Sequence, residues 1–249
     1  MEPILSIHGL SVRFGALLAV NDVSFDALAG KITAVIGPNG AGKSSLFNLI
    51  SGAVTPTRGR VMFENKDVTG TSPDHMLKVG LSRSFQITNL FFELTVQENL
   101  RLAAQFLEQG HGLFRPLAAS TRANARVDEL IVQFGLQDKA SELAGYLSHG
   151  EQRRLEIAVS LAARPRMLLL DEPTQGMSHA DTKETEIMIK GLASEHGLSI
   201  LLVEHDVDLV MNISDHVVVM HQGKKLAEGT PAQVRSNASV QAAYFGEHG

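Results

Sequence analysis

A glycine-rich segment with a single lysine carries the clearest chemistry in this sequence. Residues Gly37 to Ser44, GPNGAGKS, fit the spacing Gly-x4-Gly-Lys-Ser/Thr, whose glycines let backbone N–H groups turn inward around phosphate oxygens. We expect Lys43 to neutralise β- and γ-phosphate charge, Ser44 to hold Mg²⁺ through its hydroxyl and Ser45 to contact the α-phosphate. A plain glycine turn is the alternative, but the pattern arises by accident in only on the order of one chain in a hundred. The segment predicts a nucleoside triphosphate site made of Gly37, Pro38, Asn39, Gly40, Ala41, Gly42, Lys43, Ser44 and Ser45.

Two carboxylates and a histidine follow two other apolar runs. Asp171 and Glu172 come directly after residues 167–170. His205 comes shortly after residues 199–203. One carboxylate can bind Mg²⁺ while the next polarises the attacking water, so we expect metal binding at Asp171 and general-base catalysis at Glu172. Taken alone, such groups also fit a solvated strand end and an ordinary, partly buried histidine, but their shared position after buried runs favours the chemical interpretation.

The apolar runs have the composition of buried β-strands. Another such run, Ile32 to Ile36, precedes the glycine-rich loop, and Ser45 to Ile50 after the loop has helical character. A helix that begins at the loop directs the positive end of its dipole at a bound anion. Ligands in α/β folds bind at the carboxyl ends of parallel strands. We therefore expect the loop, the carboxylates and the histidine to lie at one edge of a mostly parallel core sheet.

Outside these runs, residues 4–25 have a strand pattern and residues 94–159 have a helical one. Short alternations of apolar and polar residues from Ile4 to Phe25 predict a small antiparallel sheet at the N-terminus. Residues 94–159 are helical in pattern, with four apolar residues at helical spacing: Val127, Leu130, Ile131 and Phe134.

The C-terminal part alternates between helices and strands. From residue 181 onward we expect a helix, the strand from Ser199, a short helix, a hairpin around Gly223 and a terminal helix. We predict a single α/β domain over residues 1–249. Its core would comprise residues 1–88 and 160–249, and a helical subdomain would be inserted at approximately 89–159.

Composition and charge limit the classes of function. Hydrophobic residues make up 44% of the 249 residues, which is enough for a substantial core, and the absence of cysteine excludes disulfides, Cys-type zinc clusters and thiol nucleophiles. It also fits a reducing compartment, so we expect the cytoplasm. The apolar runs are far shorter than the ~20 residues of a membrane helix, so membrane association is expected through a partner. A net charge of -5 without a Lys/Arg cluster argues against nucleic acid as the main ligand.

A Ser-Gly turn leads into a helix within the helical region. Leu147 to Gln152, LSHGEQ, resembles the signature motif of the ABC ATPases, in which the serine and glycine bind the γ-phosphate held by the opposite subunit. A serine cap and a helix N-terminus together make an anion site, which gives this role a chemical basis. The resemblance implies nucleotide contacts from Ser148, Gly150 and Gln152. The simpler alternative is an N-capped helix that binds no ligand.

With this motif, the resemblance to the ABC ATPases covers essentially the whole chain. It implies a P-loop NTPase fold, ATP and Mg²⁺ as ligands, and a catalytic role for Lys43. By family position Phe14 stacks on adenine and His205 is the switch histidine that contacts the γ-phosphate. Gln86 is the loop glutamine that senses the metal site and the membrane subunit, which makes it a nucleotide-binding, metal-binding and catalytic residue at once. The alternatives are a core position for Phe14 and a merely exposed polar side chain for Gln86.

The sequence departs from the common family pattern at three positions. His149 and Glu151 are unusual residues inside the signature, and Ser178 stands where the family usually has an aspartate after Glu-Pro-Thr. None of these changes removes a phosphate-binding atom. The serine lacks the aspartate carboxylate of the usual polar contact across the dimer, so we expect weaker coupling between the two sites than in members with aspartate.

Within the family, the stretches around Gln86 and His205 and the ending from Gly229 to Gly246 resemble the ATPases of branched-chain amino-acid importers. Related ATPases that serve urea, short amides, aromatic acids or lipopolysaccharide export share these features. The resemblance implies three kinds of partner: a second ABC ATPase subunit (identical or paralogous), integral membrane permease subunits and, indirectly, an extracytoplasmic solute-binding protein. It places the chain peripherally on the cytoplasmic face of the inner membrane.

Two other classes of protein are alternatives to a transporter ATPase. A soluble ABC ATPase acting on ribosomes or DNA usually carries two ATPase domains or a coiled-coil insertion, and this sequence has one domain and no sustained heptads. A P-loop kinase for a small molecule gives no reason for the motif at Ser148.

Overall fold

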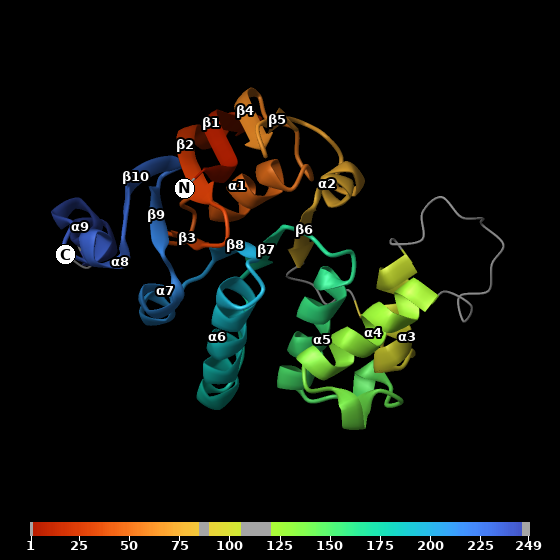
Figure 1. The fold of residues 1–249 in the computed structure, drawn as a ribbon. Coiled ribbons are helices and arrows are strands. Elements are labelled where there is room, and N and C mark those ends of the chain that lie inside the picture. The colour runs from red at the N-terminus through yellow and green to blue at the C-terminus, as the bar shows by residue number, and fades with distance from the viewer. Residues whose placement is uncertain (1, 85–89, 106–120, 246–249) are drawn as a thin grey trace.

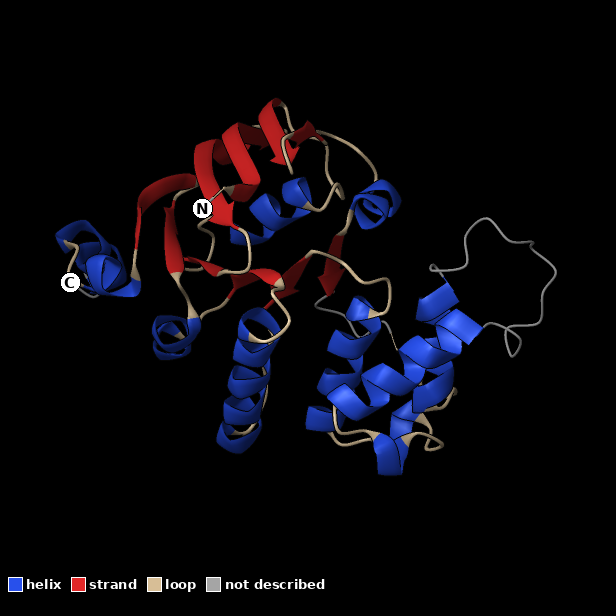
Figure 2. Ribbon diagram, viewed as in Figure 1, coloured by secondary structure: helices blue, strands red, loops and turns tan. Residues whose placement is uncertain are grey.

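A computed structural model describes residues 2–84, 90–105 and 121–245 of the chain. These residues form a six-stranded sheet through the centre of the molecule and a four-stranded sheet beside it, with helices around them (Figures 1 and 2). The strand orders are β10-β9-β3-β8-β7-β6 in the larger sheet and β2-β1-β4-β5 in the smaller one. The α/β fold predicted from the sequence is confirmed.

The predicted antiparallel sheet at the start of the chain is confirmed, and two further strands extend it. β1 (Pro3–Phe14) pairs with β2 (Leu17–Leu28) and with β4 (Arg58–Phe63), which in turn pairs with β5 (Lys66–Asp67). Buried and exposed residues mostly alternate along β1 and β2, because one face of this sheet covers the core while the other meets solvent.

The larger sheet is mostly parallel, as predicted. Its strands are β3 (Ile32–Ile36), β6 (Leu81–Ser84), β7 (Met167–Asp171), β8 (Ser199–Val203), β9 (His216–His221) and β10 (Lys224–Gly229). Only β10 pairs antiparallel within this sheet. Every residue of β3, β7 and β8 is buried, which explains why these runs are nearly continuous in apolar residues. The central strand β3 lies between β8 and β9, both of which come from the last third of the sequence.

Helix α1 (Lys43–Ile50) fills the space between the two sheets (Figure 1). Its apolar residues Leu46, Phe47, Leu49 and Ile50 are buried in one cluster with residues of both sheets. Burial against both sheets fixes the direction of α1. The helix begins directly after the glycine-rich loop, with Gly42 as its N-cap.

Three helices lie together beyond β6, to one side of the central sheet (Figure 1). They are α3 (Val96–Ala104), α4 (Thr121–Gln133) and α5 (His149–Leu161), and α3 contacts the other two. The predicted apolar stripe of α4 is buried, with Phe134 buried just past its end. The helical character of this region is therefore confirmed, while the subdomain limits at 89–159 stay a prediction.

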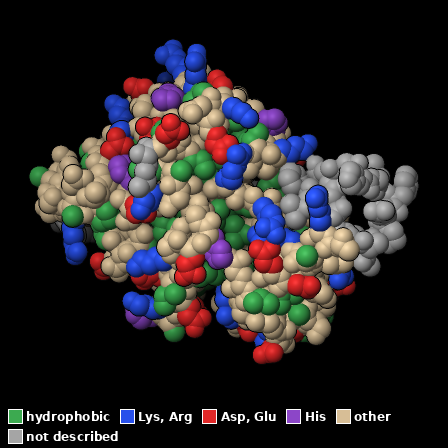
Figure 3. Space-filling view, viewed as in Figure 1, with side chains coloured by type: hydrophobic (Ala, Val, Ile, Leu, Met, Phe, Trp, Pro, Cys, Tyr) green, Lys and Arg blue, Asp and Glu red, His purple; other side chains and the backbone are tan. Residues whose placement is uncertain are grey.

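The remaining helices surround the central sheet. They are α2 (Pro73–Val79), α6 (His179–Ser194), α7 (Val207–Ile213), α8 (Pro231–Arg235) and α9 (Ala238–Phe245). Two short 3₁₀ turns, Gln137–Lys139 and Ala144–Tyr146, lead toward α5. The order of elements expected after residue 181 is confirmed. Among the described residues, no helix is both long and apolar enough to cross a membrane. On the face drawn in Figure 3, Lys and Arg side chains are interspersed with Asp and Glu.

Candidate functional site

The glycine-rich loop joins β3 to α1 and is held by close backbone contacts. Gly40 and Gly42 have left-handed φ angles of 78° and 96°. A Cβ atom at Gly42 would collide with the carbonyl oxygen of Ala19, and one at Gly37 would collide with that of Met220. Glycine is required at both positions because backbone from distant parts of the chain approaches the loop.

The turn after β9 ties this loop to the small sheet. The N–H of Gly223 donates to the carbonyl of Ala41 at 3.0 Å, and the carbonyl of Gly223 accepts from the N–H of Asn21 at 2.7 Å. A cavity of about 470 Å³ lies over the loop. Its described walls are Leu17, Leu18, Ala19, Asn39, Gly40, Ala41, Gly42, Lys43, Ser44, Ser45, Glu172, His205, Gln222 and Gly223.

Lys43 is buried inside the loop that it ends. Its ammonium donates to the carbonyl oxygens of Gly37 at 2.6 Å and Pro38 at 3.1 Å. Burial lowers the pKa of Lys43, while the negative charges of Glu172 and Asp171 act in the opposite direction. The structure therefore brings the lysine and both carboxylates together, as the positions of the strands predicted.

Asp171 ends β7 with a buried carboxylate that pairs with Arg83 of the neighbouring strand β6. The guanidinium Nη2 lies 2.8 Å from Oδ2 of Asp171. Nη1 of Arg83 donates to Asn48 Oδ1 at 2.7 Å and to Ser51 Oγ at 2.9 Å, so the same side chain also reaches α1 and the residue that caps it. The other carboxylate oxygen, Oδ1, is buried without a hydrogen-bond partner among the described residues. Such an atom fits a ligand that this protein binds but the chain does not supply.

Glu172 and His205 come from different strand ends and meet over the cavity. Oε1 of Glu172 lies 2.5 Å from Nε2 of His205. The backbone of Glu172 has a φ angle of 46°, in the left-handed region, and its N–H donates to the carbonyl of Val203 at 2.9 Å. The carboxylate is nearly buried while the imidazole is 44% exposed. Glu172 and His205, which were expected at the same edge of the sheet, are in direct contact there.

The signature segment forms a capped helix at a different place. Ser148 Oγ accepts from the N–H of Glu151 at 3.3 Å, and the Glu151 carboxylate accepts from the N–H of Ser148 at 2.8 Å, which closes a capping box on α5. The hydrogen bond from the Ser148 backbone lowers the pKa of Glu151. Glu151 thus stabilises the start of α5, and the serine cap that both interpretations of this motif share is present; nucleotide binding by the signature stays a prediction.

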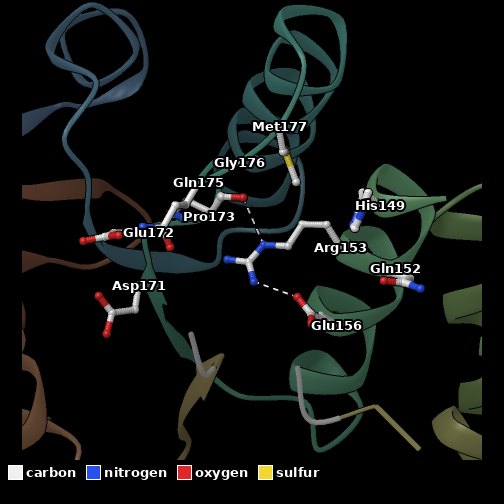
Figure 4. Close-up of a pocket in the computed structure, with 10 residues that line it drawn as sticks. All are labelled: His149, Gln152, Arg153, Glu156, Asp171, Glu172, Pro173, Gln175, Gly176 and Met177. Carbon is white, nitrogen blue, oxygen red and sulfur yellow. Dashed lines mark hydrogen bonds and ion pairs between the residues drawn. The ribbon is translucent and has the colours of Figure 1, made fainter. Parts of the chain in front are cut away.

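The structure does not bring the signature residues to the cavity over the glycine-rich loop of the same chain. Ser148 and Gly150 are not among the described walls of that cavity, and the amide of Gln152 donates to the carbonyls of Ala144 and Leu147, both at 3.2 Å. Gln152 and the unusual His149 line a smaller cavity of about 170 Å³ beside Asp171 and Glu172 (Figure 4).

In this smaller cavity, Arg153 connects α5 to the loop after β7. Its Nε donates to the carbonyl of Pro173 at 3.0 Å, and its Nη1 pairs with Glu156 at 2.7 Å (Figure 4). The helix that carries the signature is therefore attached to the residue that follows Glu172.

Ser178, the third departure, caps α6. Its Oγ accepts from the N–H of Asp181 at 3.2 Å and donates to the Asp181 carboxylate at 2.7 Å. Asp181 also lies next to the signature, since a Cβ atom at Gly150 would come within 2.9 Å of its Oδ1. Glycine at position 150 leaves room for this approach of α6 to α5.

Two expectations taken from the family resemblance concern Phe14, which is not among the described walls of either cavity, and Gln86. Phe14 is 47% exposed at the end of β1, which rules out the core alternative, and its strand partner Leu17 lines the cavity over the glycine-rich loop. Its stacking role stays a prediction. Gln86 lies outside the described residues.

Two polar residues near the site were not predicted from the sequence: Arg83, whose side chain is 10% exposed, and Glu204, which is buried. Each had a positional signal. Arg83 stands in a run that precedes Gln86, and Glu204 lies between a buried strand and His205. Assigning their partners required the order of strands in the sheet.

Comparison with known proteins decides the family. Residues 20–175 match the family model described as ABC transporter. The chain belongs to the ABC transporter ATPases. As a member of this family it binds nucleotide and hydrolyses ATP. A second model, described as branched-chain amino acid ATP-binding cassette transporter, matches residues 224–249.

Individual relatives of this ABC ATPase align along its whole length. It is 42% identical to the high-affinity branched-chain amino acid transport ATP-binding protein LivG of Escherichia coli, with 99% of both chains covered. It is 41% identical to the corresponding protein BraF of Pseudomonas aeruginosa, again with 99% of both covered. A crystal structure of an ABC transporter ATP-binding cassette in its ADP conformation superposes with a TM-score of 0.86 at 31% identity, covering 99% of this chain and 100% of that one.

Proposed function

We propose that this chain is the ATPase subunit that powers import of branched-chain amino acids across the inner membrane. The observation that carries the proposal is the match of residues 224–249, from β10 to the C-terminal end, to the branched-chain amino acid cassettes. The full-length identity to LivG and BraF supports it. The substrate itself is selected by other subunits, since no part of the ATP site reads it.

In the proposed mechanism the glycine-rich loop and α1 hold the phosphates. Backbone N–H groups and the positive end of the helix dipole face the anion, and Lys43 neutralises the β- and γ-phosphates. Phe14 stacks on the adenine. Glu172 orients and partly deprotonates the attacking water, and His205, held at 2.5 Å from that carboxylate, contacts the γ-phosphate.

Mg²⁺ fits the acidic end of this site. Asp171 offers a buried oxygen without a partner among the described residues, and Ser44 presents an exposed hydroxyl at the start of α1. Hard oxygen ligands of this kind suit Mg²⁺, which would be held here together with waters and the phosphates of the nucleotide. We assign the ion to Ser44, Asp171 and Gln86. Its chemistry there would be to neutralise charge on the γ-phosphate.

The separation of the signature from the loop supports a head-to-tail dimer. Ser148 and Gly150 lie away from the phosphate cavity of their own chain, so each ATP would gain its remaining γ-phosphate ligands from a second subunit. The chain is then largely monomeric alone and closes around two MgATP with an identical or paralogous partner.

An exposed aromatic surface supports docking of a membrane permease. Phe91 is 60% exposed, Phe92 43% and Tyr146 76%, while Leu90 is buried in the core. The carbonyl of Phe92 accepts from the N–H of Gly145 at 3.1 Å, so the Tyr146 turn lies against the same segment. Exposed aromatic clusters mark interaction sites. We assign this surface, Phe91, Phe92 and Tyr146, to a helix of the permease. The chain would thus lie on the cytoplasmic face, and a solute-binding protein would act from the opposite side.

The decisive experiment is uptake by a strain that lacks this gene. Labelled leucine, isoleucine and valine should enter poorly, and the wild-type gene should restore uptake whereas the Glu172→Gln gene should not. Labelled urea and benzoate serve as controls for the related importer classes. Unchanged leucine uptake together with loss of another solute, or a defect in lipopolysaccharide export, would overturn the substrate assignment.

A further inference from the structure

A buried carboxylate with no role in the mechanism above lies directly after β8. Glu204 is 3% exposed. Its Oε1 accepts from the N–H of Thr174 at 2.9 Å and from the hydroxyl of Thr174 at 2.7 Å. Its Oε2 accepts from the N–H of His205 at 3.0 Å. Three donors satisfy a carboxylate that burial would otherwise make costly.

These hydrogen bonds join the two loops that meet over the phosphate cavity. Thr174 belongs to the loop that carries Glu172, and His205 belongs to the loop after β8. The described walls of the cavity include Glu172 and His205 but not Glu204. Glu204 therefore lies behind the reacting groups and contacts both of their loops.

The loop that Glu204 holds contains an unfavourable backbone conformation. Glu172 has a φ angle of 46°, which a non-glycine residue adopts only where surrounding contacts enforce it. Two contacts with the end of β8 enforce this conformation. The N–H of Glu172 donates to the carbonyl oxygen of Val203 at 2.9 Å. Thr174, two residues after Glu172, is hydrogen-bonded to Glu204. The second contact depends on a side chain, so substitution can remove it.

We propose that Glu204 is a positioning residue that sets the carboxylate of Glu172 opposite the imidazole of His205. The inference rests on the proposed role of Glu172 in hydrolysis. Each carboxylate oxygen of Glu204 fixes one of the two loops. The 2.5 Å contact between Glu172 and His205 therefore depends on the buried side chain of Glu204. Displacement of a catalytic group by ~1 Å can lower turnover by about 100-fold.

Glu204→Gln tests the bridge with almost no change in volume. The amide keeps one acceptor oxygen but presents an NH₂ group where Thr174 or His205 must donate. We expect ATP turnover by the assembled transporter to fall about 10- to 100-fold, with KM and ATP affinity within about twofold of wild type. Thr174→Val, which removes only the hydroxyl donor, should lie between, and Thr174→Ser should restore turnover. The ring NMR signals of His205, assigned with His205→Gln, should shift in Glu204→Gln.

A double-mutant cycle separates this proposal from the function that it rests on. If Glu204 acts through Glu172, Glu204→Gln should cost little further turnover in a Glu172→Gln background. If the turnover losses of the two single variants add in the double variant, the proposal is overturned. It is also overturned if Glu204→Gln lowers ATP affinity and melting temperature together with turnover, because Glu204 would then be a purely structural residue. Near wild-type turnover by Glu172→Gln alone would instead refute the role of Glu172. Should Glu204→Gln not fold, the Thr174 pair of variants gives the same decision.

Discussion

The guanidinium of Arg83 lies 2.8 Å from the carboxylate of Asp171, and both side chains are at most 10% exposed. The pair joins neighbouring strands β6 and β7, and the guanidinium also lies 5.9 Å from the ring centre of Phe47 in α1. The carboxylate that we assign to Mg²⁺ is thus held by an arginine that also contacts α1, the helix after the glycine-rich loop. The proposed metal site and the glycine-rich loop are therefore supported by the same side chain.

Removal of this support should be costly. Arg83→Leu would leave Asp171 charged and buried, which lowers the free energy of unfolding by about 3–5 kcal/mol. Arg166→Leu is the matched control, because Arg166 also has an ion pair and a ring contact, with Glu64 and Phe63, but is 56% exposed. Its loss should cost about 1 kcal/mol or less. Urea denaturation of both variants measures the difference, and equal losses would contradict the structural role given to burial.

Substitution of Glu172 should separate binding from chemistry. Glu172→Gln keeps the shape but removes the carboxylate, and a positioned general base contributes about 10²- to 10⁴-fold to rate, or roughly 3–5 kcal/mol. ATP affinity should barely change, and the dimer should be trapped with ATP. Steady-state turnover, ATP affinity and mass by light scattering test this. Turnover near the wild-type rate would move the catalytic role to His205.

Substitution of Lys43 should fail in the opposite way. Lys43→Ala leaves β- and γ-phosphate charge uncompensated, so ATP affinity itself should fall, by at least about tenfold. Equilibrium binding of a fluorescent ATP analogue to the single chain measures this without hydrolysis. Affinity equal to that of Glu172→Gln would show that the buried ammonium serves the loop rather than the nucleotide.

The exposed aromatic surface should be needed for assembly and not for folding. Phe91→Asp with Phe92→Asp should abolish co-purification with the permease, because charge replaces large apolar contacts at the centre of the interface. Ile187→Asp, at a side chain 64% exposed on α6, is the control and should leave assembly intact. Thermal unfolding of the isolated chain should be similar for all variants. Retained permease binding by the double variant would place the docking site elsewhere.

The capping box at the signature should give a measurable pH dependence. Hydrogen bonding from Ser148 lowers the pKa of Glu151 below its ordinary value of 4.5. A carboxyl with a lowered folded pKa stabilises the fold fully above the ordinary value, and the stabilisation is lost as pH falls through the lowered one. Glu151→Gln keeps an acceptor for the cap but does not titrate. Urea denaturation from pH 7 to 3 should show wild type losing stability relative to Glu151→Gln, and parallel curves would contradict the contact.

The sequence predicted most elements because their signals are local. The glycine-rich loop has a fixed spacing, β3, β7 and β8 are continuous apolar runs, and Ser148 is a typical helix cap. Each of these signals lies within about a dozen neighbouring residues, so no knowledge of the tertiary structure was needed.

The contacts between loops could not be read in this way. Arg83 and Asp171 are 88 positions apart, and Thr174 and Glu204 are 30 apart, so their pairing depends on which strands are neighbours. Charge and residue type alone did not distinguish these buried pairs from solvated side chains, because burial is a property of the assembled sheet. Gln86 is a different case, since its role came from the family and its place lies outside the described residues.

The order of strands in the core sheet also has a consequence for protein synthesis. β3, which leads into the phosphate loop, has β8 and β9 as its neighbours, and the turn at Gly223 bonds the loop itself. The β1 and β2 hairpin can form as soon as it leaves the ribosome, but β3 has no sheet partner until most of the chain has followed. The proposed nucleotide site is thus encoded early in the chain and completed late. A chain cut off before β9 would carry the whole glycine-rich motif without its β9 neighbour and without the Gly223 turn that bonds to it.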